Sequence, residues 1–119
     1  MTLSISSKFF PYRLNLKRKE PVEFKIEVAN RGDKEKKVSL QILVSRALAL
    51  DKSGLANNAV YKIDSLKPNE TKTFTHTVFP KQFTGAGAYP IQIKAMEHYQ
   101  NYNYAEREYT KNIELMVDE

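Results

Sequence analysis

The sequence predicts an all-β protein built as a sandwich of about seven to eight antiparallel strands. Val22, Phe24, Ile26 and Val28 alternate with polar residues, which is typical of a strand with one buried and one solvated face. Turn signals recur about every ten residues, and no helical periodicity extends over a long segment. The 119 residues are expected to form one domain, residues 1–119. A domain of this size can bury a sufficient core without disulfides, and the absence of cysteine excludes them.

Individual elements follow from the same alternation. Leu3 and Ile5 predict a short first strand that stops at Pro11, which marks a sheet edge or a switch between sheets because proline donates no ladder hydrogen bond. Residues 46–58 are expected to form a long crossover between the sheets, with room for a short strand or helix. Residues 67–70 predict a type I turn, since proline presets the backbone at its second position. Further strands are expected at residues 14–16, 22–29, 38–44, 60–63, 71–79, 89–95 and 109–117.

Three short motifs separate the expected strands. Residues 28–32 read Val-Ala-Asn-Arg-Gly, residues 66–71 read Leu-Lys-Pro-Asn-Glu-Thr with Asn69 where glycine is usual, and residues 87–91 read Gly-Ala-Tyr-Pro-Ile. They resemble the V-x-N-x-G, L-x-P-G-E-T and G-x-Y turns of CARDB-type domains, the cell-adhesion-related Ig-like family of bacteria and archaea. The resemblance spans roughly residues 14 to 117. It implies an Ig-like or fibronectin-III-like sandwich with an adhesion or spacer role and no catalytic residues.

The last motif has a further implication under this resemblance. Tyr89 matches the tyrosine corner of Ig sandwiches, and Ile91 stands where an antibody domain carries its second cysteine. A packed apolar pair, with Phe24 or Ile26 as the partner, would replace that disulfide. Pro90 departs from the pattern, because proline removes a ladder bond from a central strand. It must therefore lie at the start of the strand or where the strand is not central.

The formal net charge of +5 permits contact with anionic partners. Many basic residues stand beside acids, as Lys19 stands beside Glu20 and Lys34 beside Asp33 and Glu35, which favours an ordinary solvated surface. A nucleic acid is therefore the alternative partner and not the expected one. Such a partner, or another polyanion, would be contacted by Lys17, Arg18, Lys19, Arg107 and Lys111.

No sequence pattern points to catalysis. The chain lacks a G-x-S-x-G elbow and an H-E-x-x-H motif, and residues 85–87, Gly-Ala-Gly, have neither the lysine nor the hydroxyl residue of a phosphate loop. A paired-carboxylate cleft, as a glycosidase needs, cannot be placed either. We therefore expect no enzyme activity, no cofactor and no metal site.

Three polar features have structural explanations that we favour over functional ones. His76 lies in the inward phase between Phe74 and Val78, so burial should keep it neutral and hydrogen-bonded. Residues 31–33 spell Arg-Gly-Asp, the integrin-binding tripeptide, but a hairpin needs a glycine and an aspartate in any case. Residues 69–71 form a glycosylation sequon on a turn, which matters only if the chain is exported.

The segment from His98 to Tyr104 is the candidate site. It reads His-Tyr-Gln-Asn-Tyr-Asn-Tyr, and tyrosine with asparagine provides rigid contact area and adaptable hydrogen bonds, as binding loops do. Loops at the end of a sandwich are also where such folds bind partners. The alternative is a long hairpin in which Tyr102 and Tyr104 pack on the sheet. The candidate partner-binding residues are His98, Tyr99, Asn101, Tyr102 and Tyr104.

The predicted function is that of a non-catalytic Ig-like module for protein or glycan binding, adhesion or spacing, and the alternative is a basic sandwich that binds nucleic acid or another polyanion. Exposed edge strands provide a second contact surface and could join copies into a homo-oligomer. Residues 1–10 do not resemble a signal peptide, and no segment approaches the roughly 18 apolar residues of a membrane helix, so no membrane insertion is expected. A complete gene product with this sequence is expected in the cytoplasm, and a piece of a longer exported chain at the cell surface.

Overall fold

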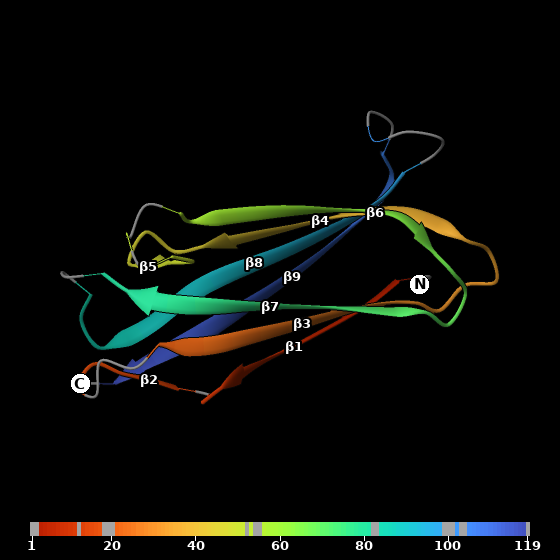
Figure 1. The fold of residues 1–119 in the computed structure, drawn as a ribbon. Coiled ribbons are helices and arrows are strands. Elements are labelled where there is room, and N and C mark those ends of the chain that lie inside the picture. The colour runs from red at the N-terminus through yellow and green to blue at the C-terminus, as the bar shows by residue number, and fades with distance from the viewer. Residues whose placement is uncertain are drawn as a thin grey trace.

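Strands make up most of the chain, and the all-β sandwich is confirmed (Figure 1). The computed structural model describes residues 3–11, 13–17, 21–51, 53, 56–81, 84–98, 102 and 105–118. These residues form nine strands and not seven to eight. The additional strand is β5, whose two residues are too few to show an alternation. The strands are β1 (Leu3–Phe10), β2 (Arg13–Asn15), β3 (Val22–Asn30), β4 (Lys36–Val44), β5 (Leu48–Ala49), β6 (Asn58–Leu66), β7 (Thr71–Pro80), β8 (Gly87–His98) and β9 (Ala105–Asp118).

The strands form two sheets that face each other. One sheet has four strands in the order β1-β3-β7-β5, and the other has five in the order β2-β9-β8-β4-β6. Neighbours are antiparallel except for β2, which runs parallel to β9. The β3–β4 connection between the sheets, the β6–β7 turn and the facing ends of β8 and β9 lie together at one end of a molecule 47 Å long (Figure 1).

Pro11 marks the point at which the chain changes sheets. Before it, β1 pairs with β3 from Leu3 to Phe10. After it, β2 pairs with the last residues of β9, in the other sheet. The Phe10–Pro11 peptide bond is cis. Of the two predicted roles for this proline, the switch between sheets is confirmed.

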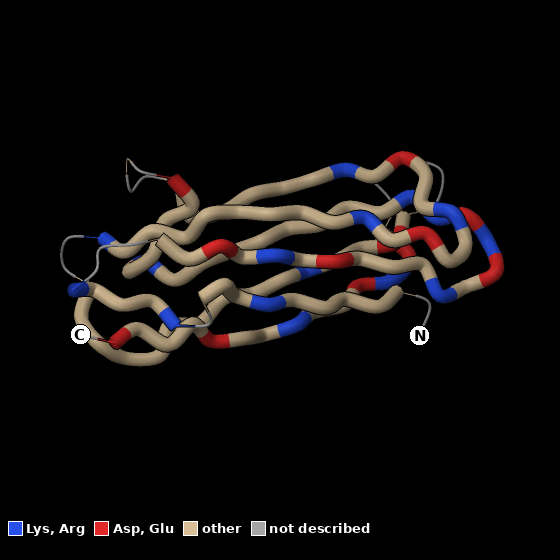
Figure 2. The backbone as a smooth tube through the Cα atoms, turned by 60° about the horizontal axis from the view of Figure 1, so that its bottom comes forward, with Lys and Arg blue, Asp and Glu red and all other residues tan. Residues whose placement is uncertain are grey.

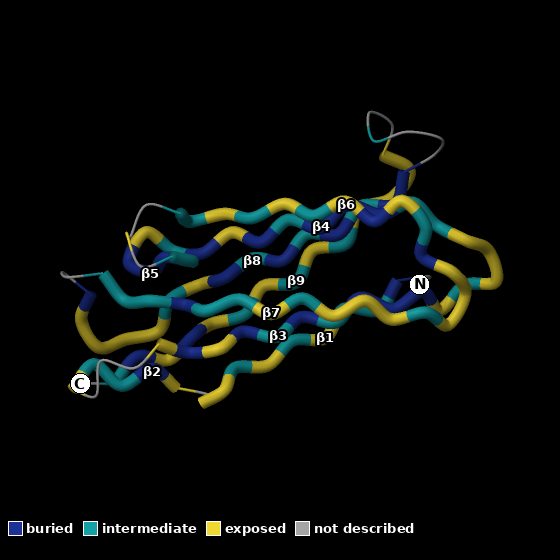
Figure 3. Tube along the Cα trace, in the orientation of Figure 1, coloured by how far each residue is buried: buried dark blue, intermediate teal, exposed yellow. Residues whose placement is uncertain are grey.

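The core lies between the sheets and consists of the inward residues of each alternating strand (Figure 3). Val22, Phe24, Ile26 and Val28 are all fully buried, as their phase in the sequence predicts. The inward residues of β4, β8 and the second half of β9 complete the same cluster. Phe24 also stacks on Phe9 of the neighbouring strand, with 4.8 Å between the ring centroids. Two alternating faces thus bury one apolar layer without a disulfide.

The segment 46–58 was expected to cross between the sheets, but it joins β4 to β6 within one sheet and reaches the other sheet through the short strand β5. Strand β5 pairs with Phe79 and Pro80 at the end of β7, so the chain leaves β4, touches the opposite sheet and returns to β6. The side chains of Leu48 and Ala49 are fully buried. Tertiary contact therefore makes this pair of residues a strand, although their sequence fits a helical turn equally well.

Tyr89 forms the hydrogen bond of a tyrosine corner, because its hydroxyl donates to the Gly85 carbonyl oxygen at 2.7 Å. Ile91 is buried in the same apolar cluster as Phe24. Pro90 is exposed, and the ladder between β8 and β4 begins one residue after it. As predicted, the proline therefore lies where its strand is not yet central.

Asn30 ties the β3–β4 connection to the β6–β7 turn. Its side chain is fully buried, and Nδ2 donates to the carbonyl oxygens of Lys34 and Leu66 at 2.8 Å each. Oδ1 accepts from the Gly32 amide at 2.9 Å. The hairpin expected around residues 31–33 was wrong, because β3 and β4 lie in different sheets and do not pair. The Arg-Gly-Asp sequence lies in a connection between the sheets that is shaped by the bonds of Asn30, so it still has a structural explanation.

The turn at residues 67–70 is type II, and the prediction of type I was wrong. Asn69, its third residue, has φ of 65°, and the Glu70 amide donates to the Lys67 carbonyl oxygen at 2.9 Å. A type II turn needs positive φ at this position, which asparagine tolerates better than most residues. This requirement explains why asparagine can stand where the resembling family usually has glycine.

Candidate functional site

The candidate site lies on the outer face of the five-stranded sheet, at the end that carries the β3–β4 connection. Of the predicted residues, His98 ends β8 and Tyr102 lies in the β8–β9 connection. Tyr99, Asn101 and Tyr104 lie outside the described residues. The structure adds residues from β4 and β6, and we call the resulting group the Tyr102 surface. It comprises Lys37, Lys62, Asp64, His98 and Tyr102.

Strand pairing brings these residues to one face. Lys37 pairs with His98 across β4 and β8, and Ser39 pairs with Lys62 across β4 and β6. Val38 and Ile63 point into the core, so their chain neighbours Lys37 and Lys62 point outward. Sequence reasoning missed Lys37, Lys62 and the other contributors from these strands. The sequence shows only that these residues face outward from their strands, and it does not show which strands are neighbours.

His98 is held in place by one hydrogen bond beneath Tyr102. Its Nε2 lies 2.7 Å from the Ser39 Oγ, and both side chains are buried. Its ring contacts Tyr102 edge-on, with 5.2 Å between centroids. Nδ1 of His98 is buried and has no hydrogen-bond partner among the residues that the structure describes. The imidazole therefore supports the tyrosine and keeps one unused polar atom.

Tyr102 is fixed by contacts around its ring and at its hydroxyl. The hydroxyl donates to Asp64 Oδ1 at 2.5 Å. Lys37 Nζ lies 4.8 Å and Lys62 Nζ 5.0 Å from the ring centroid, within the range of cation–π contacts. Lys37 Nζ is also 3.7 Å from Asp64 Oδ1. The packing of Tyr102 on the sheet thus agrees with the alternative prediction, although the residue stays partly exposed.

Tyr102 and Asp64 shift each other's pKa in opposite directions. Burial of the phenol and its hydrogen bond to Asp64 raise the pKa of Tyr102 to about 12. The same hydrogen bond, followed by the charge of Lys37, lowers the pKa of Asp64 below its ordinary value of 3.8. At neutral pH the tyrosine is therefore a neutral donor to an ionised carboxylate, with an ammonium group beside them.

A hollow of about 420 Å³ adjoins this group. Basic and acidic residues crowd the same end of the molecule in Figure 2, where blue and red segments alternate over the turns. Three lysines, three acids and His98 surround the hollow, so it presents both signs of charge. Its lining residues are Lys34, Glu35, Lys36, Lys37, Asp64, His98 and Glu106.

The other residues singled out in the sequence lie elsewhere. His76 is half-buried and its Nε2 lies 2.5 Å from the hydroxyl of Tyr61 in the opposite sheet, while burial lowers its pKa below 6.5. The hydrogen bond and the direction of the pKa agree with the expected neutral, hydrogen-bonded histidine. Asn69 is exposed on its turn.

The described members of the set of cations predicted for a nucleic-acid partner, Lys17, Arg107 and Lys111, do not gather. Lys17 follows β2, beside the last residues of β9, whereas Arg107 lies near the start of β9. The strand separates these two points by roughly 35 Å at about 3.3 Å per residue. Lys111 is half-buried, and its Nζ donates to the Ile5 carbonyl oxygen at 3.4 Å. Arg18 and Lys19 lie outside the described residues.

Two further features of the described residues bear on ligands. No three histidine, aspartate or glutamate side chains lie close enough there to share a metal ion. The described part of the chain also contains no helix that could cross a membrane.

Solved structures share this fold at low sequence identity. A CARDB domain from Pyrococcus furiosus, solved in complex with di-metal ions, matches with a TM-score of 0.64 and 18% identity, over 97% of this chain and 86% of that one. AvmM, which catalyses macrocyclization in alchivemycin A biosynthesis, matches with a TM-score of 0.60 and 11% identity, over 99% and 89% of the chains. The Pseudomonas fluorescens alkylpurine DNA glycosylase AlkC, bound to DNA containing an abasic site analog, matches with a TM-score of 0.55 and 10% identity. That alignment covers 99% of this chain but 31% of the glycosylase.

The match to the Pyrococcus furiosus domain confirms the resemblance to CARDB domains at the level of the fold. No protein-family model and no curated protein sequence matches the chain. The di-metal ions belong to the Pyrococcus furiosus domain, and the described residues of this chain include no comparable ligand cluster.

Proposed function

We propose that this chain is a non-catalytic binding module that holds a protein partner through the Tyr102 surface. The observation that carries the proposal is the fixed, partly exposed ring of Tyr102, held by Asp64, Lys37 and Lys62 above the buried His98. An aromatic ring that is already ordered loses little conformational freedom on binding, and such residues often dominate interface energies. The likeness to a cell-adhesion-related domain agrees with this role.

The Ser39–His98 pair has the separation of a nucleophile and a base, but its position does not favour catalysis. The Ser39 side chain is buried and does not line the adjoining hollow. A nucleophile must reach the reacting atom of its substrate, so this hydroxyl is better explained as support for the histidine ring.

A protein partner fits the Tyr102 surface better than a glycan does. Sugars commonly stack on an open aromatic face, whereas two ammonium groups already lie over this ring. The hollow also combines lysines with acids, and a protein surface can offer complementary charges of both signs. The partner is therefore expected to present acidic and basic residues around an apolar contact for Tyr102.

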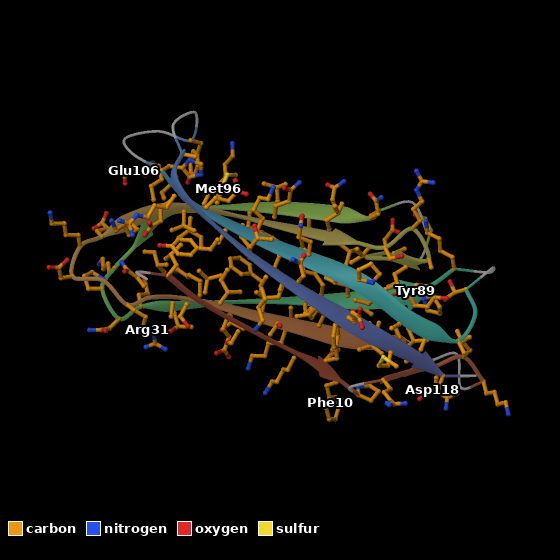
Figure 4. The ribbon with its side chains drawn as sticks, turned by 180° about the vertical axis from the view of Figure 1, so that it is seen from behind. Phe10, Arg31, Tyr89, Met96, Glu106 and Asp118 are labelled. Atoms are coloured by element: carbon orange, nitrogen blue, oxygen red, sulfur yellow. The ribbon has the colours of Figure 1, made fainter. Side chains whose placement is uncertain are left out.

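The test compares two aromatic residues at different places on the molecule. Immobilised chain is used to capture partners from an extract of the source cells, and the captured proteins are identified by mass spectrometry. Tyr102→Ala should abolish capture of the specific partner, whereas Phe10→Ala should not. Phe10 is the matched control because its side chain is 75% exposed and it lies at the switch between β1 and β2 (Figure 4). Capture that survives Tyr102→Ala, with both variants folded by circular dichroism, would contradict the proposal.

A second candidate function, binding of a nucleic acid or another polyanion, is favoured by one observation. Lys34, Lys36 and Lys37 lie around one hollow, even though the cations first predicted for this role are dispersed. Binding of single-stranded DNA should then weaken steeply as salt rises, because phosphate contacts release counterions. No binding at low salt in a fluorescence anisotropy titration would remove this candidate.

A further inference from the structure

The open flank of the sandwich, between β1 and β9, has the features of a strand-binding surface. We propose that it accepts an extended segment of another protein in which apolar residues alternate with basic ones. The flank lies apart from the Tyr102 surface, so this inference goes beyond the proposed function and is tested separately. Figure 4 views the molecule from the side on which β9 passes from Glu106 to Asp118 in front of the other strands.

Among the described strands, most of β9 has a neighbour on one side only. β8 pairs with it along its length, whereas β2 reaches only Met116, Val117 and Asp118. The Leu16 amide donates to the Asp118 carbonyl oxygen at 2.9 Å, so the backbone groups of Asp118 point toward the flank. Backbone groups alternate sides along a strand. Every second residue before Asp118 therefore also points its backbone groups toward the flank. Four of these residues have no described backbone partner there, namely Glu108, Thr110, Asn112 and Glu114.

A hollow of about 410 Å³ lies beside this unpaired edge, between the two sheets. Leu3 and Ile5 line it from β1, and Tyr109 with Lys111 lines it from β9. Ile5 and Tyr109 are only partly buried while packing against the core. A strand added to β9 would point every second side chain into this hollow, and apolar side chains there would complete the burial.

The outward-facing side chains of β9 determine which residues the partner strand should carry on its own outward face. Its outward side chains include four acids and no lysine or arginine, so outward basic residues on an added strand would be attracted to them. β2 already shows this arrangement, because Leu14 is fully buried and Arg13 Nη1 lies 3.1 Å from Asp118 Oδ1. A partner strand would continue along the edge where β2 stops. The four acids are Glu106, Glu108, Glu114 and Asp118.

A second copy of the chain fits this edge poorly. In a two-fold symmetric dimer, β9 would pair antiparallel with β9 of the second copy. If the symmetry axis passes through Glu108, the two copies of Glu108 face each other, and an axis through Lys111 brings the two copies of Lys111 together in the same way. Centring on Tyr109 places Arg107 opposite Lys111 of the second copy, and centring on Thr110 places Glu106 opposite Glu114 of the second copy. Each of these registers opposes like charges, which is destabilising in a cross-strand pair. Lys111, in the inward phase, also discourages indiscriminate pairing.

The probe is a synthetic octapeptide in which valine alternates with lysine, and the control peptide has glutamate in place of lysine. Binding to the whole chain is measured by isothermal titration, and amide exchange by NMR. The lysine peptide should bind at least about tenfold more tightly than the glutamate peptide, and it should protect the amides of Glu108, Thr110 and Asn112. Equal binding of both peptides, or protection confined to other strands, would overturn the proposal.

Two variants test the backbone and the charge separately. Thr110→Pro removes an amide that points toward the flank and leaves the β8 ladder intact, so binding should fall about tenfold or more, while Thr110→Val keeps the amide and should bind normally. Glu114→Lys should weaken binding of the lysine peptide while the protein stays folded. This variant keeps the proposal testable if Thr110→Pro is unstable. Light scattering that shows a dimer of the wild type, abolished by Thr110→Pro, would assign the flank to self-association and overturn it.

Discussion

Two asparagines near the β3–β4 connection stabilise the structure through different properties of the same side-chain type. Asn30 uses both its donors and its acceptor, because its buried amide satisfies backbone groups of Gly32 and Lys34 in this connection and of Leu66 at the end of β6. Asn69 uses its tolerance of positive φ in a type II turn. The two are linked, since the Asn69 amide donates to the Asn30 carbonyl oxygen at 2.7 Å.

Replacing Asn30 should be the most costly of the polar substitutions. Asn30→Ala leaves the buried Leu66 carbonyl and the partly buried backbone groups of Gly32 and Lys34 without this partner, so the free energy of unfolding should fall by about 1–3 kcal/mol. Urea denaturation measures this change. Asn58→Ala, at an exposed strand position, is the matched control and should change stability by less than about 0.5 kcal/mol. Equal effects of the two substitutions would contradict the role assigned to Asn30.

His76 should make stability depend on pH in the acidic range. Burial lowers its pKa below the ordinary 6.5, so between these two values the unfolded chain binds more protons than the folded chain. The free energy of unfolding therefore rises with pH in this window, and stability is lost as pH falls below about 6.5. Urea midpoints at several pH values between 5 and 8 measure the slope. His76→Gln should flatten it, and an unchanged slope in that variant would assign the effect to other groups.

At the scale of elements, β2 is the clearest case of a strand stabilised by tertiary contact. It has three residues and is anchored by Leu14, which is fully buried, and by the ion pair of Arg13 with Asp118. An exposed ion pair contributes little, so the buried leucine should supply most of the stabilisation.

Leu14→Ala should therefore lower the free energy of unfolding by about 2–5 kcal/mol, because it removes buried methyl groups and leaves a cavity. Leu43→Ala, where the leucine is 42% exposed on β4, is the control and should cost less than about 1 kcal/mol. Thermal and urea unfolding measure both. If Leu14→Ala were as mild as the control, β2 would be held by its ladder hydrogen bonds and not by its side chain.

At the scale of the whole molecule, the two sheets share one apolar core, so we predict that residues 1–119 unfold as a single cooperative domain. Far-ultraviolet circular dichroism and tyrosine fluorescence should show coincident transitions. Leu14→Ala in the five-stranded sheet and Ile26→Val in the four-stranded sheet should each shift that one transition. Two separable transitions would show that the sheets unfold independently.

The fold was more predictable than the site. Alternation in Val22–Val28 and in β4 identified buried faces, and proline, glycine and asparagine identified turns, because these signals are local. The site needed His98 and Tyr102, which a loop rich in tyrosine indicates, together with Lys37, Lys62 and Asp64, which nothing local indicates. Strand β2 was expected at residues 14–16 and lies at residues 13–15, whereas β5 was one of two possibilities for its segment, because two residues show no period.

The sequence by itself determined which face of each long strand is buried, where the chain turns and that the sheets need no disulfide. Each of these properties depends on a residue and its near neighbours, through side-chain hydrophobicity and backbone preference. Only the tertiary structure decided which strands are adjacent, that β2 joins β9, and that Tyr102 lies between lysines of two other strands. Those outcomes depend on pairing between residues far apart in the chain, where many registers satisfy the same alternation and the shared core selects one.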